Sequence, residues 1–291
     1  MTEVGAEPAW DEVVRLAERC LEADGGMPLA TEEWFLRRRW AASGARTFAL
    51  RADDGALLAA GAVTPALIVT GLVDPAARGR GLGARILDHG LIVAAAMAEA
   101  GPAPITVETE SLTAGADALF VSRGLRQFFA EDVMRIDLSR PLPPPLAGFP
   151  PGTTLTTWSA ESAPRFHAAY EAAFRDRPNF PGDSAAEWIA EYDEDDEFRP
   201  GWSLLAATPD QGDVAFVTAA EGWIVQVGVD PRARGRGLAK ALVQSALSRM
   251  TPTEAWLNVN VDNPGAAALY RRLGFTGVGR RARYRTRPPT S

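Results

Sequence analysis

A phrase with closely spaced glycines occurs twice in the chain, and it constrains the fold more than any other feature. The copies are Asp74–Gly83 (DPAARGRGLG) and Asp230–Ala239 (DPRARGRGLA), each after an apolar run. Glycines let the backbone approach a ligand closely, and the first N–H groups of a helix lack intrahelical partners. Each copy therefore predicts a strand that turns into a helix through a phosphate-binding loop. The repetition predicts two related halves and weakens the alternative of an incidental turn.

We call Arg78–Gly83 the first glycine loop and Arg234–Ala239 the second glycine loop. Their spacing, Gly-Arg-Gly-Leu-Gly or Gly-Arg-Gly-Leu-Ala, is not the G-x-G-x-x-G pattern of dinucleotide-binding domains. The Lys-Ser/Thr pair of nucleotide-hydrolysing loops is also missing. The sequence therefore argues against a nucleoside triphosphatase.

Length and composition bound the remaining classes. At 291 residues the chain is long enough for two domains, each with its own core. A formal net charge of −7 argues against nucleic acid as a partner and favours a cationic or neutral substrate. The single cysteine, Cys20, excludes an internal disulfide and a thiolate metal cluster, so we expect no metal and a buried structural thiol. No secretion signal and no long apolar run is present, so we expect a cytoplasmic protein without a membrane partner.

The predicted elements follow the same order in both halves: helices, a strand meander, a glycine loop with its helix, then strand, helix and strand. This order predicts an α/β fold with a mixed sheet flanked by helices. Six prolines lie between Ser139 and Gly152, a density typical of an extended linker. We therefore expect domains at 1–140 and 153–291, joined by a linker at 141–152.

A second segment follows the second glycine loop after a further strand: Asn263-Pro-Gly-Ala-Ala-Ala-Leu-Tyr-Arg-Arg-Leu-Gly-Phe275. Together, the two segments resemble the GNAT superfamily of N-acetyltransferases. The resemblance is strong in the second half and partial in the first. It implies two tandem GNAT-like domains, each a mostly antiparallel mixed sheet flanked by helices. It also implies acetyl-CoA as the co-substrate, with its pyrophosphate in the loop and its pantetheine arm beside the preceding strand.

The resemblance assigns site residues by position. Val227 and Val229 would flank the pantetheine arm, and Asn263 would contact it, although an N-cap role before Pro264 is an equally good interpretation. The pyrophosphate cradle of the second half would be Arg234, Gly235, Arg236, Gly237, Leu238 and Ala239. The corresponding residues of the first half are Arg78, Gly79, Arg80, Gly81 and Gly83.

Tyr270 resembles the general acid of the family, which protonates the departing CoA thiolate. A phenol is protonated at neutral pH and suits this role, whereas the alternative is an aromatic core residue. Phe120 and Thr113 stand opposite Tyr270 and Asn263 in the first half. A catalytically silent first half that still binds CoA is expected. The tandem arrangement is similar to that of the mycothiol synthase family, which acetylates the cysteine amine of a small thiol.

The sequence alone does not identify the general base. The strand before the second loop carries Gln226 where an acid is often found, which leaves Glu221 or a water-mediated route. Glu108 and Glu110 align with Asn258 and Asn260, so the acids occur in the half without the phenol and keep a second active site open. His89 and His167 lie in helical patterns and are interpreted as structural.

The sequence thus predicts an acetyl-CoA-dependent N-acetyltransferase that acts on a primary amine of a small molecule. Two alternatives remain: an acyl-CoA-binding sensor or scaffold, and acetylation of a protein N-terminus or lysine. An acidic run at 191–197 is either an attractant for a cationic amine or a solvated loop. We expect a monomer or homodimer.

Overall fold

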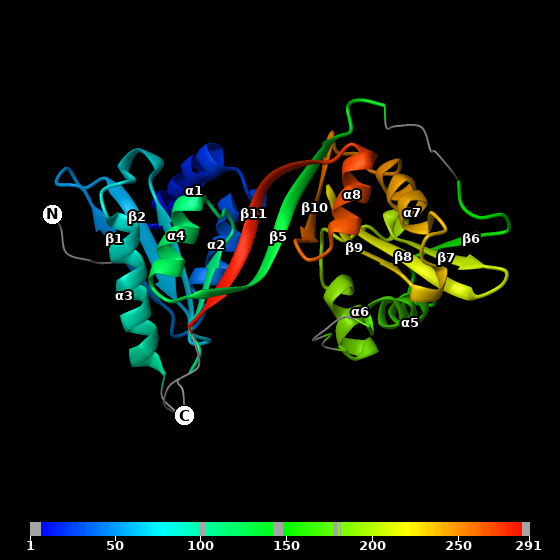
Figure 1. Ribbon diagram of the computed structural model, residues 1–291, viewed down its shortest axis with the longest axis horizontal. Helices are drawn as coiled ribbons and strands as arrows, with labels where there is room; N and C mark the ends of the chain where they lie inside the picture. Colours follow the sequence, from blue (N-terminus) through cyan, green and yellow to red (C-terminus); the bar gives the residue numbers. More distant parts are fainter. Residues whose placement is uncertain (1–6, 99–102, 142–147, 177–179, 181, 287–291) are drawn as a thin grey trace. The chain divides into compact units, whose positions relative to one another are not determined.

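The computed structural model describes residues 7–98, 103–141, 148–176, 180 and 182–286, which form two compact units (Figure 1). The first unit contains the chain up to Val133, Asn260–Asp262 and the residues from Gly277 onward. The second unit contains Met134–Val259 and Asn263–Thr276. The expected boundary at 141–152 stays a prediction, and residues 142–147 of that linker lie outside the described residues.

The first unit is a mixed sheet with strand order β1-β2-β3-β4-β11-β5. Its helices are α1 (Trp10–Asp24), η1 (Pro28–Thr31), α2 (Glu33–Trp40), η2 (Pro75–Ala77), α3 (Leu82–Met97) and α4 (Ala114–Ser122). Its strands are β1 (Arg46–Arg51), β2 (Leu57–Val63), β3 (Ile68–Val73), β4 (Thr106–Thr109), and the parts of β5 (Arg126–Asp137) and β11 (Thr276–Arg285) that belong to it.

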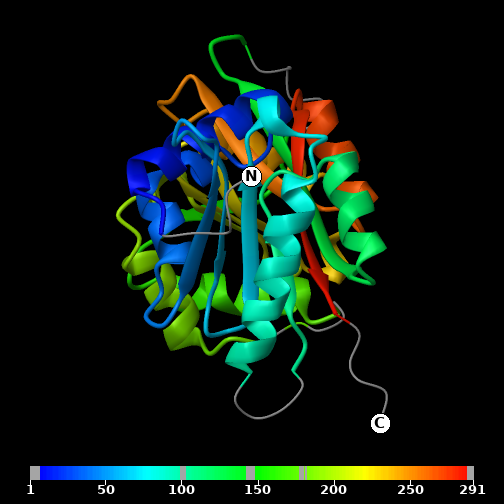
Figure 2. The same cartoon turned by 90° about the vertical axis from the view of Figure 1, so that its left-hand side faces the viewer.

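The two faces of this sheet carry different helices (Figure 2). Helices α1 and α2 cover one face, where Leu16 and Trp40 pack on Ala60 and Ala62 of β2. Helices α3 and α4 cover the other, where Ile86 packs with Ala59 and Val63 of β2. Successive side chains of a strand point to opposite faces, so one strand serves both cores. Strand β2 is therefore apolar along its length and does not alternate apolar with polar residues.

The second unit repeats this plan with strand order β5-β10-β9-β8-β7-β6. Its helices are α5 (Ala163–Phe174), α6 (Ala185–Asp193), η3 (Pro200–Trp202), η4 (Pro231–Ala233), α7 (Leu238–Leu247) and α8 (Pro264–Leu273). Its strands, besides the end of β5, are β6 (Thr154–Thr157), β7 (Leu204–Thr208), β8 (Gly212–Ala220), β9 (Trp223–Val229) and β10 (Glu254–Asn260). An aromatic cluster around Trp158 and Trp188 joins α5 and α6 to β7 and β8. Leu242 of α7 and Tyr270 of α8 belong to the core on the other face.

The predicted fold class, a mixed sheet flanked by helices, is confirmed in both units. Local signals set the helix ends. Asn263 caps the start of α8, Pro264 occupies its first position, and Gly274 ends it with a left-handed φ of 102°. In the described ranges, no helix has both the length and the apolarity that a membrane crossing requires.

Strand β11 completes the first unit although it lies at the end of the chain. Its residues Ala282–Arg285 pair antiparallel with Thr106–Thr109 of β4. The side chain of Tyr284 is fully buried there, and its ring lies 4.9 Å from the ring of Phe120. Its hydroxyl donates a hydrogen bond to Asp117 and lies 3.0 Å from the side-chain oxygen of Gln127. Burial is the main reason why the pKa of Tyr284 is raised above its ordinary value. A residue close to the C-terminus thus holds part of the first core.

The Tyr284→Ala substitution should destabilise the first unit selectively. Removing a buried aromatic ring costs about 4 kcal/mol through lost burial and the cavity that remains. We expect hydrogen exchange of the β4 and α4 amides to accelerate, while the α7 amides stay protected. The matched variant Leu257→Ala in the core of the second unit should give the reverse pattern. Equal protection of α4 in wild type and Tyr284→Ala would contradict this role of β11.

Candidate cofactor loop and active site

In both units the strand before the glycine loop parts from the strand that follows the loop helix. Strand β9 pairs in parallel with β10 only at Trp223 and Trp256 among the described residues. Strand β3 pairs with β4 only at Ile68–Thr106 and Val69–Val107, again within the described ranges. Beyond these points the two strands of each pair have no further pairing among the described residues, and we call this parted region of each sheet the opening. An unpaired strand edge can accept an extended ligand as an added strand.

The hydrogen-bond alternation shows which residues face this opening. The N–H of Asp230 donates to the carbonyl of Val214 at 2.8 Å, and Gly228 lies opposite Phe216 in the same ladder. Bonded and non-bonded pairs alternate in an antiparallel ladder, so Val227 and Val229 direct their N–H and C=O groups away from β8. These are the two residues that the sequence assigned to the pantetheine arm. By the same alternation, Gly71 and Val73 face the opening of the first unit.

Strand β9 carries a bulge that β3 lacks in its described pairing. The β8–β9 register shifts between Thr218 and Ala219, which leaves Val225 as the additional residue, 46% exposed. The register of β2 with β3 runs from Ala59–Val73 to Val63–Val69 without a shift. A bulge re-aims backbone groups and is frequent beside active sites. The second unit thus has a locally different backbone two residues before Val227.

The two glycine loops have nearly the same backbone. Gly79 and Gly81 have φ of 74° and 77°, and the corresponding values for Gly235 and Gly237 are 79° and 82°. A Cβ at any of these four positions would meet no described atom within 4 Å. The glycines are therefore required for the left-handed backbone, and the cradle in front of them is open. Helices α3 and α7 begin at the next residue, where unpaired N–H groups and the helix dipole favour a phosphate.

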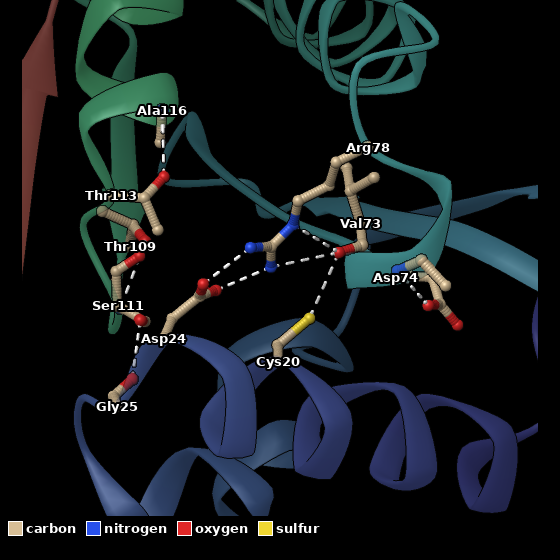
Figure 3. Close-up of polar contacts among 11 residues, drawn as sticks. Cys20, Asp24, Gly25, Val73, Asp74, Arg78, Thr109, Ser111, Thr113 and Ala116 are labelled. Carbon is tan, nitrogen blue, oxygen red and sulfur yellow. Dashed lines mark hydrogen bonds and ion pairs between the residues drawn. The ribbon is translucent and has the colours of Figure 1, made fainter.

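The first arginine of each loop is held by an aspartate at or just after the end of the first helix of its unit. Arg78 forms two 2.6 Å bonds to Asp24, and its Nε also donates to the carbonyl oxygen of Val73 at 3.4 Å (Figure 3). The hydrogen bond with Asp24 is the main cause of the raised pKa of Arg78. Arg234 lies 2.9 Å from Asp176 and donates to the carbonyl of Val229 at 3.3 Å. These two arginines position the loops against the helices.

The second arginine of each loop is also exposed. Arg236 forms an exposed ion pair with Asp210 at 3.1 Å. Arg80 is exposed and has no ion pair with any residue in the described part of the chain. An exposed ion pair contributes little, so a phosphate can displace Asp210 from Arg236.

Tyr270 lies in the same apolar cluster as the residues that face the opening. Its side chain is 8% exposed, and its ring packs edge-to-face on Phe275 at 5.9 Å. Val227 and Val229 pack against this cluster from β9. Tyr270 and the two valines of β9 thus belong to one apolar cluster of the second unit, and the ring also has the core role named as the alternative. Its role as an acid stays a prediction.

Asn263 acts as an N-cap, as one interpretation predicted. Its Oδ1 accepts from the N–H of Ala266 at 3.1 Å, and in the first unit Thr113 accepts from Ala116 at the same distance (Figure 3). The cap is thus common to both units, whereas the side-chain amide is present only in the second. A contact of this amide with a cofactor stays a prediction.

The candidate acids are engaged in ion pairs. Glu221 accepts from Arg199 at 2.7 Å. In the first unit Arg39 of α2 lies 2.6 Å from Glu108 and 2.8 Å from Glu110. Sequence reasoning missed this network, because it depends on the packing of α2 and on two β11 arginines, Arg281 and Arg283, that also bind these acids.

Other titratable side chains have structural environments. His167 Nε2 lies 3.0 Å from the carbonyl oxygen of Asp183, and His89 packs against Phe48. Burial raises the pKa of the Cys20 thiol, which disfavours the nucleophilic thiolate. Gln226, whose position invites an acid, has a buried Oε1 without a hydrogen-bond partner among the described residues. An amide at this position can orient an amine but cannot take its proton.

The comparisons with known proteins agree with this geometry. The model of the acetyltransferase (GNAT) family matches residues 154–275. Mycothiol acetyltransferases of Thermobispora bispora and a Nocardioides species are each 30% identical to the chain, over 91% of the chain and 92% of the relative. The chain belongs to the GNAT acetyltransferase family and is an N-acetyltransferase.

Solved structures extend the likeness to the whole chain. A GCN5-related N-acetyltransferase from Sphaerobacter thermophilus superposes with a TM-score of 0.76 at 29% identity, covering 98% of this chain and 96% of that one. A tandem GNAT protein from the clavulanic acid biosynthesis pathway gives a TM-score of 0.61 at 17% identity, over 97% and 95% of the two chains. The second match shows the fold alone.

The Asn263→Thr substitution separates the two roles of Asn263. Threonine retains the N-cap, as Thr113 does in the first unit, but lacks the amide. We expect an unchanged melting temperature and a KM for acetyl-CoA raised about three- to tenfold by the loss of one hydrogen bond. Asn263→Ala is the control, because it also removes the cap and should cost about 1 kcal/mol of stability. An unchanged KM in Asn263→Thr would leave Asn263 with the cap alone.

Proposed function

We propose that the second unit transfers the acetyl group of acetyl-CoA to a primary amine of a small molecule by direct attack on the thioester. The observation that carries this proposal is the meeting of three features in one unit: the parted strands, the bulge at Val225, and Tyr270 in the cluster that contains Val227 and Val229. The first unit has the parted strands and the loop, but Phe120 in place of the phenol. The relatives named mycothiol acetyltransferases support a small-molecule acceptor.

In this proposal, the position of each residue in the second unit decides its role. The N–H groups at the start of α7 and the side chain of Arg236 hold the pyrophosphate, and Arg234 keeps the loop against α5. Acetyl-CoA supplies the activated acyl group. The N–H of Val227, which faces the opening, stabilises the negative charge that develops on the thioester oxygen. Tyr270 donates a proton to the sulfur as the C–S bond breaks.

The acceptor must present a neutral amine. Glu221 is bound to Arg199, so we propose that the amine loses its proton to water before or during attack, while Gln226 accepts a hydrogen bond from it. The new C–N bond forms as the thiolate leaves. This route predicts a rate that rises with pH until the amine is deprotonated.

A second candidate function belongs to the first unit. A cavity of about 420 Å³ lies there, lined by residues of the first glycine loop and by Phe120. A volume of this size suits a ligand of drug size. The first unit would bind CoA or its thioesters through Arg80 and the N-terminus of α3, without transfer.

Tyr270→Phe tests the assignment of the chemistry to the second unit. It retains the ring and its packing but removes the proton donor. We expect kcat to fall about a hundredfold or more, while the KM for acetyl-CoA and the melting temperature stay near their wild-type values. The measurement is release of free thiol with a panel of primary amines.

The matched variant is Phe120→Tyr, which places a phenol in the first unit. It should leave kcat unchanged, because the first unit lacks the bulge. An unchanged kcat in Tyr270→Phe would overturn the acid role. Absence of thiol release by the wild type with every amine, together with binding of CoA, would favour the sensor function.

A further inference from the structure

The cavity of the first unit passes through its sheet. Ile86 of α3 and Leu119 of α4 line it on one face, and Ala17 of α1 and Leu36 of α2 line it on the other. It crosses the sheet where β3 and β4 part, beyond Val69 and Val107. A ligand whose phosphates lie in the first glycine loop can therefore extend through the opening to the face covered by α1 and α2.

The part of the cavity on the α1/α2 face is an apolar chamber. Leu72 of β3 packs in the α1/α2 core, so Thr70, two residues earlier on the same strand, faces the same side. The chamber wall is formed by small and apolar side chains: Ala17, Leu21, Met27, Ala30, Phe35 and Leu36. The whole cavity, of about 420 Å³, has more room than an acetyl group would fill.

One polar group in the chamber lacks a partner. Thr70 is 8% exposed, lines the cavity, and its Oγ1 has no hydrogen bond to any described residue. Burying a hydroxyl without a hydrogen bond destabilises the protein. A ligand carbonyl in the chamber would accept a hydrogen bond from this hydroxyl.

The charged side chains of the cavity wall are already paired. Asp24 is bound to Arg78, and Arg39 is bound to both Glu108 and Glu110. The charges thus compensate one another. A neutral ligand tail fits this wall, whereas a carboxylate would compete with two glutamates for Arg39.

In the second unit, side chains and helix α5 occupy the position that corresponds to the chamber. Gly228 stands where β3 has Leu72, and a Cβ there would lie 2.4 Å from Phe216 and 2.8 Å from Ala173. Helix α5 and Phe216 therefore pack directly on β9. The two units therefore differ on the face where an acyl group would project.

We propose that the first unit binds a CoA thioester whose acyl chain is neutral, apolar and longer than acetyl. The chain lies in the chamber under α1 and α2, and Thr70 donates a hydrogen bond to its carbonyl oxygen. This inference rests on the proposed binding of CoA by the first glycine loop. Phe120 offers no proton to the sulfur, so the thioester is held and not consumed.

The test uses full-length protein with one loop disabled at a time. Gly237→Val and Gly81→Val each place a β-branched residue at a left-handed position inside a phosphate cradle. Isothermal titration calorimetry of Gly237→Val, which keeps the first loop, should show affinity rising about fourfold per methylene from acetyl-CoA through propionyl-CoA to butyryl-CoA. Succinyl-CoA should bind more weakly than butyryl-CoA. Gly81→Val should show no such rise.

Two further variants in the Gly237→Val background locate the acyl chain. Ala30→Leu fills the chamber and should abolish the dependence on chain length without changing the affinity for CoA. Thr70→Val should raise the melting temperature of the free protein and weaken binding of butyryl-CoA, again without an effect on CoA. If Gly237→Val does not fold, the same ligand series is titrated into wild type, where the first-unit site is the one sensitive to Ala30→Leu.

Equal affinities for acetyl-CoA and butyryl-CoA at the first-unit site would overturn the inference while leaving its CoA site intact. An absence of CoA binding to both loop variants and to wild type would instead refute the proposed function.

Discussion

The hydrogen-bond ladder between β9 and β10 ends soon after it starts, and the proposed function depends on that early end. In a continuous sheet the N–H and C=O groups of Val227 and Val229 would be satisfied by β10. Here they face an opening, and the same arrangement recurs beside β3. Each unit thus offers an extended ligand a backbone edge at the place where the glycine loop offers its phosphates a helix N-terminus. The backbone edge and the helix N-terminus follow one another along one strand and its loop, so a single long ligand can contact both.

The features that local sequence encodes were predicted from it. The glycine loops, the apolar strands before them and the N-cap of α8 depend on residues within a few positions of one another. Features that depend on distant pairing were not predicted. The ion pair of Arg78 with Asp24 requires the packing of α1 on the loop, and the membership of β11 in the first unit requires its pairing with β4. The bulge at Val225 leaves no mark in composition or periodicity.

The two units share a frame and differ at the positions that bear on chemistry. The aspartate that holds the first loop arginine and the cap of the last helix are common to both. The phenol, the side-chain amide and the bulge occur in the second unit, and the acid network occurs in the first. Features that maintain the loop have therefore been retained in both, whereas the group suited to protonating a thiolate is present only in one. The cavity under α1 and α2 lies in the first unit, which has Phe120 in place of the phenol.

The contribution of β11 to the first unit has a consequence for synthesis of the protein. A ribosome delivers the N-terminus first, and domains generally fold as units in that order. Here the core around Phe120 is incomplete until Tyr284 is synthesised. Tyr284 is translated after all residues of the second unit, which ends at Thr276. The edge of β4 that β11 later covers is an unpaired strand edge during this interval, and such edges promote aggregation. All residues of the second unit are therefore synthesised before the first unit can be completed, and a chain that stops short of β11 leaves the earlier half unfinished.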